Sequence, residues 1–334
     1  MPDRLRRVIA ALTSRPVVKG AFLVFFVWIS ARLLAFASWA RGEGPYVPRP
    51  EAVAGILPVG HFTSFFAWLK GGGWDTLLPA GLVIIIAALA TSLLFKRGFC
   101  GWICPVGTVW EGAAALGRRL LGHNVRLPKW LDRTGMGLRY LIGIAFFGFV
   151  GMVSLAEAVG FRQLPYMWVA DIKIIEGFGQ PLFIVVILLA FVVSMLLGPV
   201  WCRYVCPLGA LYSAVGLASP CAIQRDASTC IDCGKCSRIC HAFVDVQHAD
   251  VVRAVECDGC MDCVRVCPVP ACLEANVVGR TRIAPWVWPL LVVGLWLGIY
   301  AIAKLTGNWD TTIPDEAFRQ IINSGLLEQT TPMF

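Results

Sequence analysis

The fold follows from two stretches of the sequence, CIDCGKCSRIC at residues 230–240 and CDGCMDCVRVCP at residues 257–268. Each has the spacing Cys-x2-Cys-x2-Cys-x3-Cys, and three closely spaced cysteines in a tight loop supply three corners of a cubane cluster. In two-cluster ferredoxins the fourth cysteine of each stretch binds the other cluster. The spacing therefore predicts one [4Fe–4S] cluster on Cys230, Cys233, Cys236 and Cys267, and a second on Cys257, Cys260, Cys263 and Cys240.

Zinc is the alternative metal for these cysteines, because Cys-x2-Cys pairs also build zinc ribbons. A zinc ribbon normally draws on two separated pairs, whereas each stretch here holds four cysteines close together, so the pattern favours iron and sulfide. His241 stands where a proline usually follows the fourth cysteine. Cys221 and Cys272 belong to neither stretch, and we expect them to be buried free thiols.

The rest of the chain has the composition of an integral membrane protein. It is 57% hydrophobic and 15% charged, whereas soluble proteins carry about 25% charge. Apolar blocks of about 20 residues, the length that crosses the hydrocarbon core, lie near 20–40, 77–95, 138–159, 181–200 and 284–305. The net charge of +8 does not indicate nucleic-acid binding, because the basic residues flank these blocks instead of forming one stripe.

The predicted fold class is an all-α membrane protein with five transmembrane helices and an internal two-hairpin repeat. An α+β ferredoxin domain of the bacterial 2[4Fe–4S] type is inserted on the cytoplasmic side. The predicted parts are a four-span membrane domain at 1–220, the ferredoxin domain at 221–280, a fifth transmembrane helix at 281–306 and a periplasmic tail at 307–334.

The distribution of lysine and arginine predicts the orientation, since cytoplasmic loops carry an excess of both. Residues 1–19 contain five, residues 96–139 eight and residues 203–283 eight. We therefore expect a multi-pass protein of the bacterial inner membrane, with the N-terminus and the ferredoxin domain in the cytoplasm and the C-terminus in the periplasm.

A second cysteine motif occurs twice, 102 residues apart. FCGWICPVGTVW at residues 99–110 aligns with WCRYVCPLGALY at residues 201–212, so each copy contains Cys-x3-Cys-Pro. Two thiols are too few for a cubane cluster, but the two copies together supply the four that an iron–sulfur centre uses. We expect one shared metal or redox site on Cys100, Cys104, Cys202 and Cys206. The alternatives are thiol pairs that pack or oxidise without a metal, and copper bound by soft thiolates.

The two Cys-x3-Cys-Pro motifs, followed by the double ferredoxin stretch, resemble the NapH/NosR/CcoG/MauN group of bacterial membrane ferredoxins over roughly residues 75–275. The resemblance implies electron transfer linked to respiratory or periplasmic redox enzymes, with quinol oxidation for the NapH type. The fifth predicted span and the tail depart from the four-span NapH plan.

The expected function is electron transfer by an inner-membrane iron–sulfur protein, between the quinone pool or a cytoplasmic donor and a partner redox enzyme. Whether it works as a quinol dehydrogenase subunit is left open. The alternative is an assembly or maturation factor that reduces a metal or a thiol for a periplasmic or respiratory metalloenzyme. Expected partners are membrane lipid, further redox subunits and quinol.

A quinone site needs an apolar slot with a few polar groups. The candidates are Trp168, Asp171, Lys173 and Glu176, in the loop between the third and fourth spans, with Glu157 and Arg162 just before it. His61 could be a heme ligand, a proton acceptor or a structurally satisfied histidine, and Arg32 could pair with a neighbouring helix carbonyl or acid or contact a quinone. Interfacial charges and tryptophans also belong to any membrane boundary, so both interpretations stay open.

The C-terminal tail has the pattern of a short amphipathic helix. Pro314 can begin it, and Phe318, Ile321, Ile322 and Leu326 recur at helical spacing. A helix this short is marginal alone. We expect it to order against a partner subunit or against the outer loops of the same chain.

Overall fold

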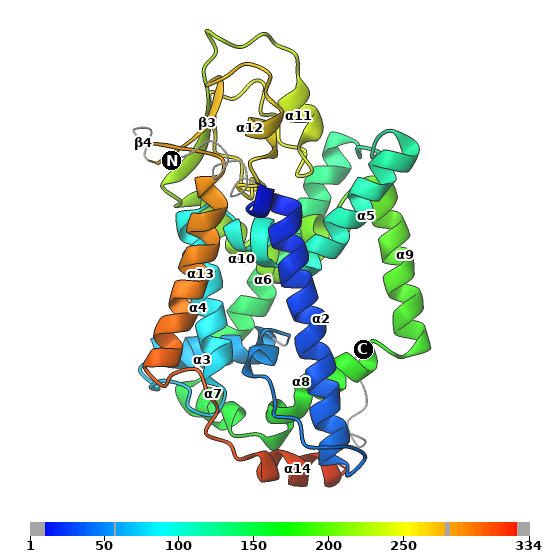
Figure 1. Ribbon diagram of the computed structural model, residues 1–334, viewed down its shortest axis with the longest axis vertical. Helices are drawn as coiled ribbons and strands as arrows, with labels where there is room; N and C mark the ends of the chain where they lie inside the picture. The colour runs from blue at the N-terminus through cyan, green and yellow to red at the C-terminus, as the bar shows by residue number, and fades with distance from the viewer. Residues whose placement is uncertain (1–10, 57, 278–280, 326–334) are drawn as a thin grey trace. The chain divides into compact units, whose positions relative to one another are not determined.

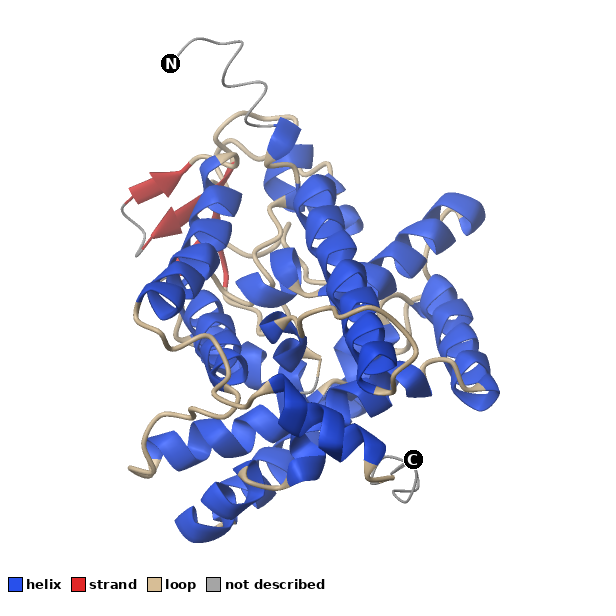
Figure 2. Ribbon diagram, turned by 60° about the horizontal axis from the view of Figure 1, so that its bottom comes forward, coloured by secondary structure: helices blue, strands red, loops and turns tan. Residues whose placement is uncertain are grey.

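The computed structural model describes residues 11–56, 58–277 and 281–325, which are mostly helical, with one small sheet (Figure 2). The helices are α2 Arg15–Ala40, α3 Pro58–Leu69, α4 Pro79–Leu94, α5 Pro105–Leu121, α6 Lys129–Met152, α7 Leu155–Arg162, α8 Pro165–Gly177, α9 Pro181–Leu197, α10 Pro207–Leu217, α11 Lys235–Ile239, α12 Asp262–Val266, α13 Val287–Leu305 and α14 Asp315–Asn323. The single-turn helices are η1 Glu51–Gly55, η2 Phe99–Ile103 and η3 Trp201–Val205. The strands are β1 Cys221–Arg225, β2 Val251–Val252, β3 Leu273–Val277 and β4 Thr281–Ile283.

Helix lengths identify a membrane protein. Among the described residues, three helices, α2, α6 and α13, are long and apolar enough to cross a bilayer. Helices α8 and α9, which meet at a bend of 70°, give a fourth crossing if they count as one. The predicted span at 77–95 corresponds to α4, which has only 16 residues. Membrane association is thus confirmed, while the count of five spans stays a prediction.

The predicted third span, near 138–159, lies earlier in the chain than expected. The structure has α6 at Lys129–Met152 and starts α7 at Leu155. Ser154 caps α7, since its hydroxyl accepts a hydrogen bond from the Glu157 N–H at 3.2 Å while the Glu157 carboxylate accepts one from the Ser154 N–H at 3.0 Å. This capping box ends the apolar block inside the predicted span.

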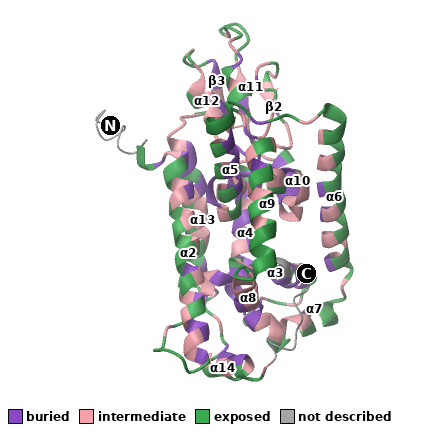
Figure 3. Ribbon diagram, turned by 90° about the vertical axis from the view of Figure 1, so that its right-hand side faces the viewer, coloured by how far each residue is buried: buried purple, intermediate pink, exposed green. Residues whose placement is uncertain are grey.

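One face of the helical part is open to its surroundings. Most of α9 is exposed (Figure 3), including Leu182, Leu188 and Leu189, which are 75%, 57% and 61% exposed. Leucines on an unpacked face of such an apolar helix are expected where lipid surrounds the protein.

The chain divides into two compact units. The first comprises the described parts of residues 1–23, 88–145 and 189–297, and the second those of residues 24–87, 146–188 and 298–334. Both Cys-x3-Cys-Pro motifs and the ferredoxin segment therefore lie in the first unit. The second unit contains α3, α7, α8 and α14.

Within the first unit, the ferredoxin segment is built on a four-stranded antiparallel sheet with the order β2-β1-β3-β4. In the β1–β3 pair, Cys221 faces Val277 and Ile223 faces Ala275. The buried residues of β1 and β3 alternate with less buried ones at the start of each strand, as expected for a half-covered sheet. Helices α11 and α12 pack on each other beside β3 (Figure 1).

Within the second unit, the C-terminal helix α14 folds back on its own chain. Phe318 is fully buried, and its ring lies 5.9 Å from that of Phe36 and 6.5 Å from that of Trp168. The Arg49 guanidinium lies 4.9 Å from the same ring. The tail therefore packs against its own chain, which is one of the two arrangements expected from the sequence. Leu326 lies outside the described residues.

Candidate functional site

The two ferredoxin stretches form loops with matching backbone conformations. Asp232 and Gly234 in the first loop have φ angles of +53° and +65°, and Gly259 and Met261, at the equivalent positions of the second, have +64° each. Non-glycine residues rarely adopt this left-handed conformation. Two such turns in each loop wrap the chain around one centre, after which α11 or α12 begins.

The structure brings together the four cysteines that the spacing assigns to the first cluster. Cys230, Cys233, Cys236 and Cys267 line one cavity in the ferredoxin segment. Cys267 reaches this cavity from the other stretch, as the exchange of fourth cysteines predicts. Cys272 lines the same cavity.

The second set is also brought together. Electrostatic interactions connect Cys263 to both Cys257 and Cys240, and Cys260 to Cys263. Burial raises the pKa of Cys257 to about 12, so a thiolate at this position needs a compensating positive charge. Iron supplies that charge, because a coordinating thiol is deprotonated by the metal. The donor sets therefore fit two iron–sulfur clusters.

Both Cys-x3-Cys-Pro copies have the same local structure. In each, a single π-helical turn, η2 or η3, ends at the second cysteine, and an α-helix begins at the proline that follows. The Cys104 Sγ accepts a hydrogen bond from the Gly107 N–H at 3.4 Å, and the Cys206 Sγ accepts one from the Gly209 N–H at 3.3 Å. Single π-helical turns frequently mark functional sites.

The four thiols of these copies lie close enough to interact. Cys202 interacts electrostatically with Cys100, Cys104 and Cys206, and Cys104 interacts with Cys100 and Cys206. Burial raises the pKa of Cys104 to about 12. Four partly buried thiols in one place are unfavourable as free thiolates and suit a bound metal centre.

The second ferredoxin loop packs directly on the first Cys-x3-Cys-Pro motif. A Cβ atom at Gly101 would lie 2.6 Å from the carbonyl oxygen of Asp258. The Trp102 indole N–H donates a hydrogen bond to the Gly259 carbonyl at 3.0 Å. Arg97 hydrogen-bonds the Cys100 thiol. It also donates to the Glu256 carbonyl at 3.4 Å, so it connects the two motifs.

Gly101→Ala should disrupt this contact, because an added methyl group cannot fit between the two backbones. We expect destabilisation of about 1–3 kcal/mol, typical of overpacking. Gly112→Ala is the matched control, since nothing lies within 4 Å of a Cβ atom there. Thermal unfolding in detergent should show a lower midpoint for Gly101→Ala only. Equal midpoints for both variants would contradict the contact.

A network of charges lies beside this contact. Arg15 Nη2 lies 2.6 Å from a Glu111 carboxylate oxygen and 3.5 Å from one of Asp258, and Lys19 Nζ lies 2.8 Å from Glu111. His241 Nε2 lies 2.9 Å from Asp258. His241 thus replaces the usual proline with a hydrogen-bond partner for the second loop.

Sequence reasoning did not single out Arg15, Arg97, Glu111 or Asp258. Arg97 comes three residues before Cys100, and Asp258 follows Cys257 directly. Charges beside cysteines were the available signal, but flanking charges are common at membrane boundaries. Only the contacts distinguish these residues from ordinary flanking charges.

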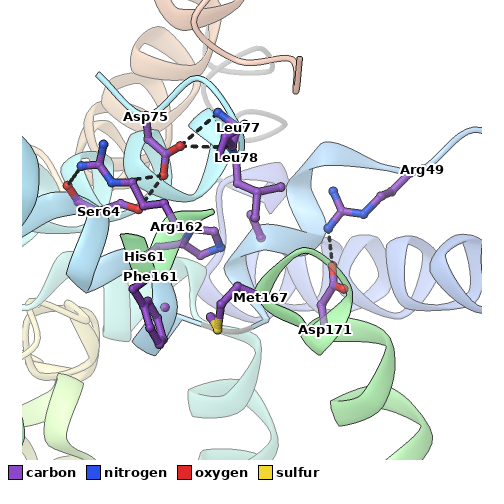
Figure 4. A pocket seen from close by; sticks show the side chains of 12 residues that line it. Arg49, His61, Ser64, Asp75, Leu77, Leu78, Phe161, Arg162, Met167 and Asp171 are labelled. Carbon is purple, nitrogen blue, oxygen red and sulfur yellow. Dashed lines mark hydrogen bonds and ion pairs between the residues drawn. The ribbon is translucent and has the colours of Figure 1, made fainter. Parts of the chain in front are cut away.

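The second unit contains a separate polar cavity (Figure 4). The Ser64 hydroxyl donates to the Asp75 carboxylate at 2.5 Å, and the Arg162 guanidinium donates to the Ser64 carbonyl at 2.7 Å. Asp171 pairs with Arg49 at 2.5 Å. His61 also lines the cavity, together with Leu77, Leu78, Phe161 and Met167.

Two quinone candidates from the sequence, Arg162 and Asp171, line this cavity together with His61. The others have different contacts. Glu157 caps α7, Glu176 pairs with Arg41 at 2.5 Å, and the Trp168 indole donates to the Arg162 carbonyl at 2.9 Å. Arg32 lies 5.7 Å from the ring of Trp28 on its own helix, and Lys173 does not line the cavity.

Comparison with protein families agrees with this geometry. A family described as "4Fe-4S binding domain" matches residues 77–124 and 179–219, the segments that contain the Cys-x3-Cys-Pro copies. A family described as "4Fe-4S dicluster domain" matches residues 222–269. No solved structure matches the chain.

Individual relatives identify the larger family. YccM of Escherichia coli K12, whose name refers to electron transport, is 34% identical over 93% of this chain and 90% of its own length. The "Ferredoxin-type protein NapH" of Haemophilus influenzae is 27% identical over 61% of this chain and 59% of its own. The chain belongs to the NapH/NosR/MauN-type membrane ferredoxins.

Membership in these membrane ferredoxins makes the protein an iron–sulfur electron-transport protein of a membrane. Lengths within the group differ widely. The "Regulatory protein NosR" of Pseudomonas aeruginosa is 30% identical over 61% of this chain, but the match covers only 29% of NosR.

Proposed function

We propose that this protein carries single electrons between the quinone pool, or a cytoplasmic donor, and a partner redox enzyme. The observation that carries the proposal is the packing of the second ferredoxin loop on the first Cys-x3-Cys-Pro motif, through Gly101 and Asp258. Thiol sets for two redox centres are thereby held against each other by backbone contacts. A fixed arrangement of this kind suits electron transfer between neighbouring centres.

The proposed ligands are those that the sequence assigns. Cys230, Cys233, Cys236 and Cys267 would hold the first [4Fe–4S] cluster, and Cys257, Cys260, Cys263 and Cys240 the second. A further centre is proposed on Cys100, Cys104, Cys202 and Cys206. When bound, such clusters accept and release one electron at a time, at potentials set by net charge, hydrogen bonds to sulfur and exposure to solvent.

Residues of the chain tune these proposed centres. The N–H groups of Gly107 and Gly209 donate to Cys104 and Cys206, and Arg97 places a buried positive charge beside Cys100. Each of these interactions favours the more negative, reduced state of a centre.

The cavity around His61 is the proposed quinone site. Its lining combines apolar side chains such as Phe161 and Met167 with several polar and charged groups, and polar groups that orient a ligand are a feature of small-molecule sites. Burial lowers the pKa of His61 to about 4, so the imidazole is neutral near pH 7 and its unprotonated ring nitrogen can accept a hydrogen bond from a quinol hydroxyl. The Arg162 and Arg49 guanidinium groups are candidate donors to a quinone oxygen.

The proposed location is the bacterial inner membrane, with the ferredoxin segment in the cytoplasm. The support is the excess of lysine and arginine in residues 1–19, 96–139 and 203–283, which follows the positive-inside rule. Partner redox subunits in the membrane or the periplasm are likewise proposed.

Cys233→Ala tests the proposed clusters. Purified anaerobically, the wild-type protein should contain acid-labile sulfide and at least the eight iron atoms of two cubane clusters. Cys233→Ala should lose iron from the first cavity and keep the reduced-state electron paramagnetic resonance (EPR) signal of the second. Cys221→Ala, a buried thiol outside both stretches, is the control and should keep all its iron. Zinc without sulfide would contradict the assignment.

Reduction of the wild-type clusters by a short-chain quinol, without dithionite, tests the electron-transfer role. If the clusters exchange electrons with a cytoplasmic ferredoxin but never with quinol, the quinone pool is not the donor. The alternative function is that of a maturation factor, which would be dispensable once its client enzyme is assembled. Stopping synthesis of the protein after assembly therefore separates the two functions, because only an electron carrier is still needed for electron flow.

A further inference from the structure

The first ferredoxin cavity is lined by five thiols, one more than a cubane cluster binds. The fifth is Cys272, which lies outside residues 222–269, the range of the dicluster family match. Cys272 is 3% exposed, so its thiol faces the protein interior and not the solvent. Burial alone would make it an ordinary packed cysteine, but its neighbours are the proposed cluster ligands.

The backbone holds Cys272 at this position. The Cys272 N–H donates to the Val269 carbonyl at 3.3 Å, and the Cys272 carbonyl accepts from the Asp226 N–H at 2.8 Å. Ala271, directly before it, has a φ angle of +63°, a conformation that alanine rarely adopts. Such backbone strain persists where surrounding contacts impose it, and here it returns the chain from Cys267 to the same cavity.

The Cys272 thiol also interacts with a proposed ligand. It lines the same cavity as Cys267 and Cys230 and interacts with both side chains, and its S–H group donates to the Asp226 carbonyl at 3.7 Å. The equivalent position of the other stretch, five residues after Cys240, is Asp245. The Asp245 carboxylate is paired with His248 at 2.8 Å and accepts from Ser237 at 3.1 Å. The fifth thiol is therefore particular to the first cavity.

We propose that Cys272 is a reserve ligand of the first cluster, an inference that rests on the proposed iron–sulfur function. In the resting state its S–H group donates to the Asp226 carbonyl, beside the Cys267 sulfur. When the bond between iron and Cys267 breaks, Cys272 binds the same iron, and its proton moves to the freed Cys267 thiolate. One iron–sulfur bond replaces another, so no electron is transferred and the net charge is unchanged.

Cys267→Ala tests the proposal in the full-length protein purified in detergent without oxygen. We expect this variant to keep the iron and sulfide content of the wild type, because Cys272 completes the cluster and releases its proton to water. Cys267→Ala with Cys272→Ala should lose iron and show the EPR signal of an oxidised three-iron cluster. Cys240→Ala is the matched control in the second set of cysteines and should behave like the double variant.

Cys272→Ala alone gives an independent measurement on a protein with all eight proposed ligands. With a chelator present, it should lose iron from the first cavity about 10-fold faster than the wild type, the lower end of the effect of residues around metal ligands. Cys221→Ala, which removes a buried thiol of strand β1, should match the wild type.

The outcomes separate this inference from the proposed function. If Cys267→Ala loses as much iron as Cys240→Ala, or if Cys272→Ala releases iron at the wild-type rate, Cys272 is not a reserve ligand. If the wild-type protein holds no iron and sulfide, the proposed function itself is wrong. The reduced-state signal of the second cluster reports whether each first-cavity variant has folded.

Discussion

Replacement of Cys100 by serine should remove the whole metal centre proposed at the Cys-x3-Cys-Pro motifs, although three of its four thiols remain. Cys202 interacts with each of the other three cysteines, so the four thiols converge on one place and a centre built there depends on all of them. Replacing Cys202 in addition should therefore remove little more. The expected loss is all of the iron beyond that of the two ferredoxin clusters.

Iron and sulfide analysis of wild type, Cys100→Ser, Cys202→Ser and the double variant measures this effect. Cys221→Ser is the control for loss of a buried thiol outside the site. Two independent sites would give additive losses, with the double variant losing about twice as much as either single one. Free thiols at all four positions in the wild type, detected by alkylation after denaturation, would sink the shared centre and favour thiol chemistry at the motifs.

Arg15→Met should have the second large effect. The Arg15 side chain is 10% exposed and lies 2.6, 2.8 and 3.5 Å from the carboxylates of Glu111, Asp262 and Asp258. Its Nε–H also donates to the Gly101 carbonyl at 3.0 Å. Removing one partner of a buried ion pair leaves uncompensated charges and costs about 3–5 kcal/mol. The loss should fall on the contact between the second ferredoxin loop and Gly101.

Arg41→Met is the matched control, because Arg41 pairs with Glu176 at 2.5 Å but both side chains are about one third exposed. Exposed pairs contribute about 0–1 kcal/mol. Thermal unfolding in detergent should show a much larger drop in midpoint for Arg15→Met. Faster alkylation of Cys257 after removal of iron should accompany it. Equal drops for the two variants would mean that the network around Arg15 contributes no more than a surface pair.

Part of what only the structure revealed was present in the sequence. Ser154 and Glu157 form a capping box whose Ser-x-x-Glu pattern can be read directly, yet the predicted span at 138–159 ran through it. Apolar composition alone defined that block, and composition is insensitive to a single capping residue. The C-terminal helix, in contrast, was placed correctly by Pro314 and by the spacing of Phe318 and Ile322.

Other features had no signal along the chain. Gly101 and Asp258 are far apart in sequence, as are Arg15 and Asp262, and nothing in their neighbourhoods predicts that they touch. Cys272 appeared to be an ordinary buried thiol, because its place in the first cavity depends on the turn at Ala271 and on the pairing of β3 with β1.

By itself, the sequence determined the features that depend on short spacing and on composition. These are the two ferredoxin loops, the repeated Cys-x3-Cys-Pro motif and the apolar helices. Cysteines separated by two or three residues are held close together by the short chain between them, and long runs of apolar residues require a membrane. Tertiary structure alone decided the contact of the second loop with Gly101, the charges gathered around Arg15 and the fifth thiol of the first cavity. Each of these joins residues that are distant in sequence, and such contacts form only when separate elements pack together.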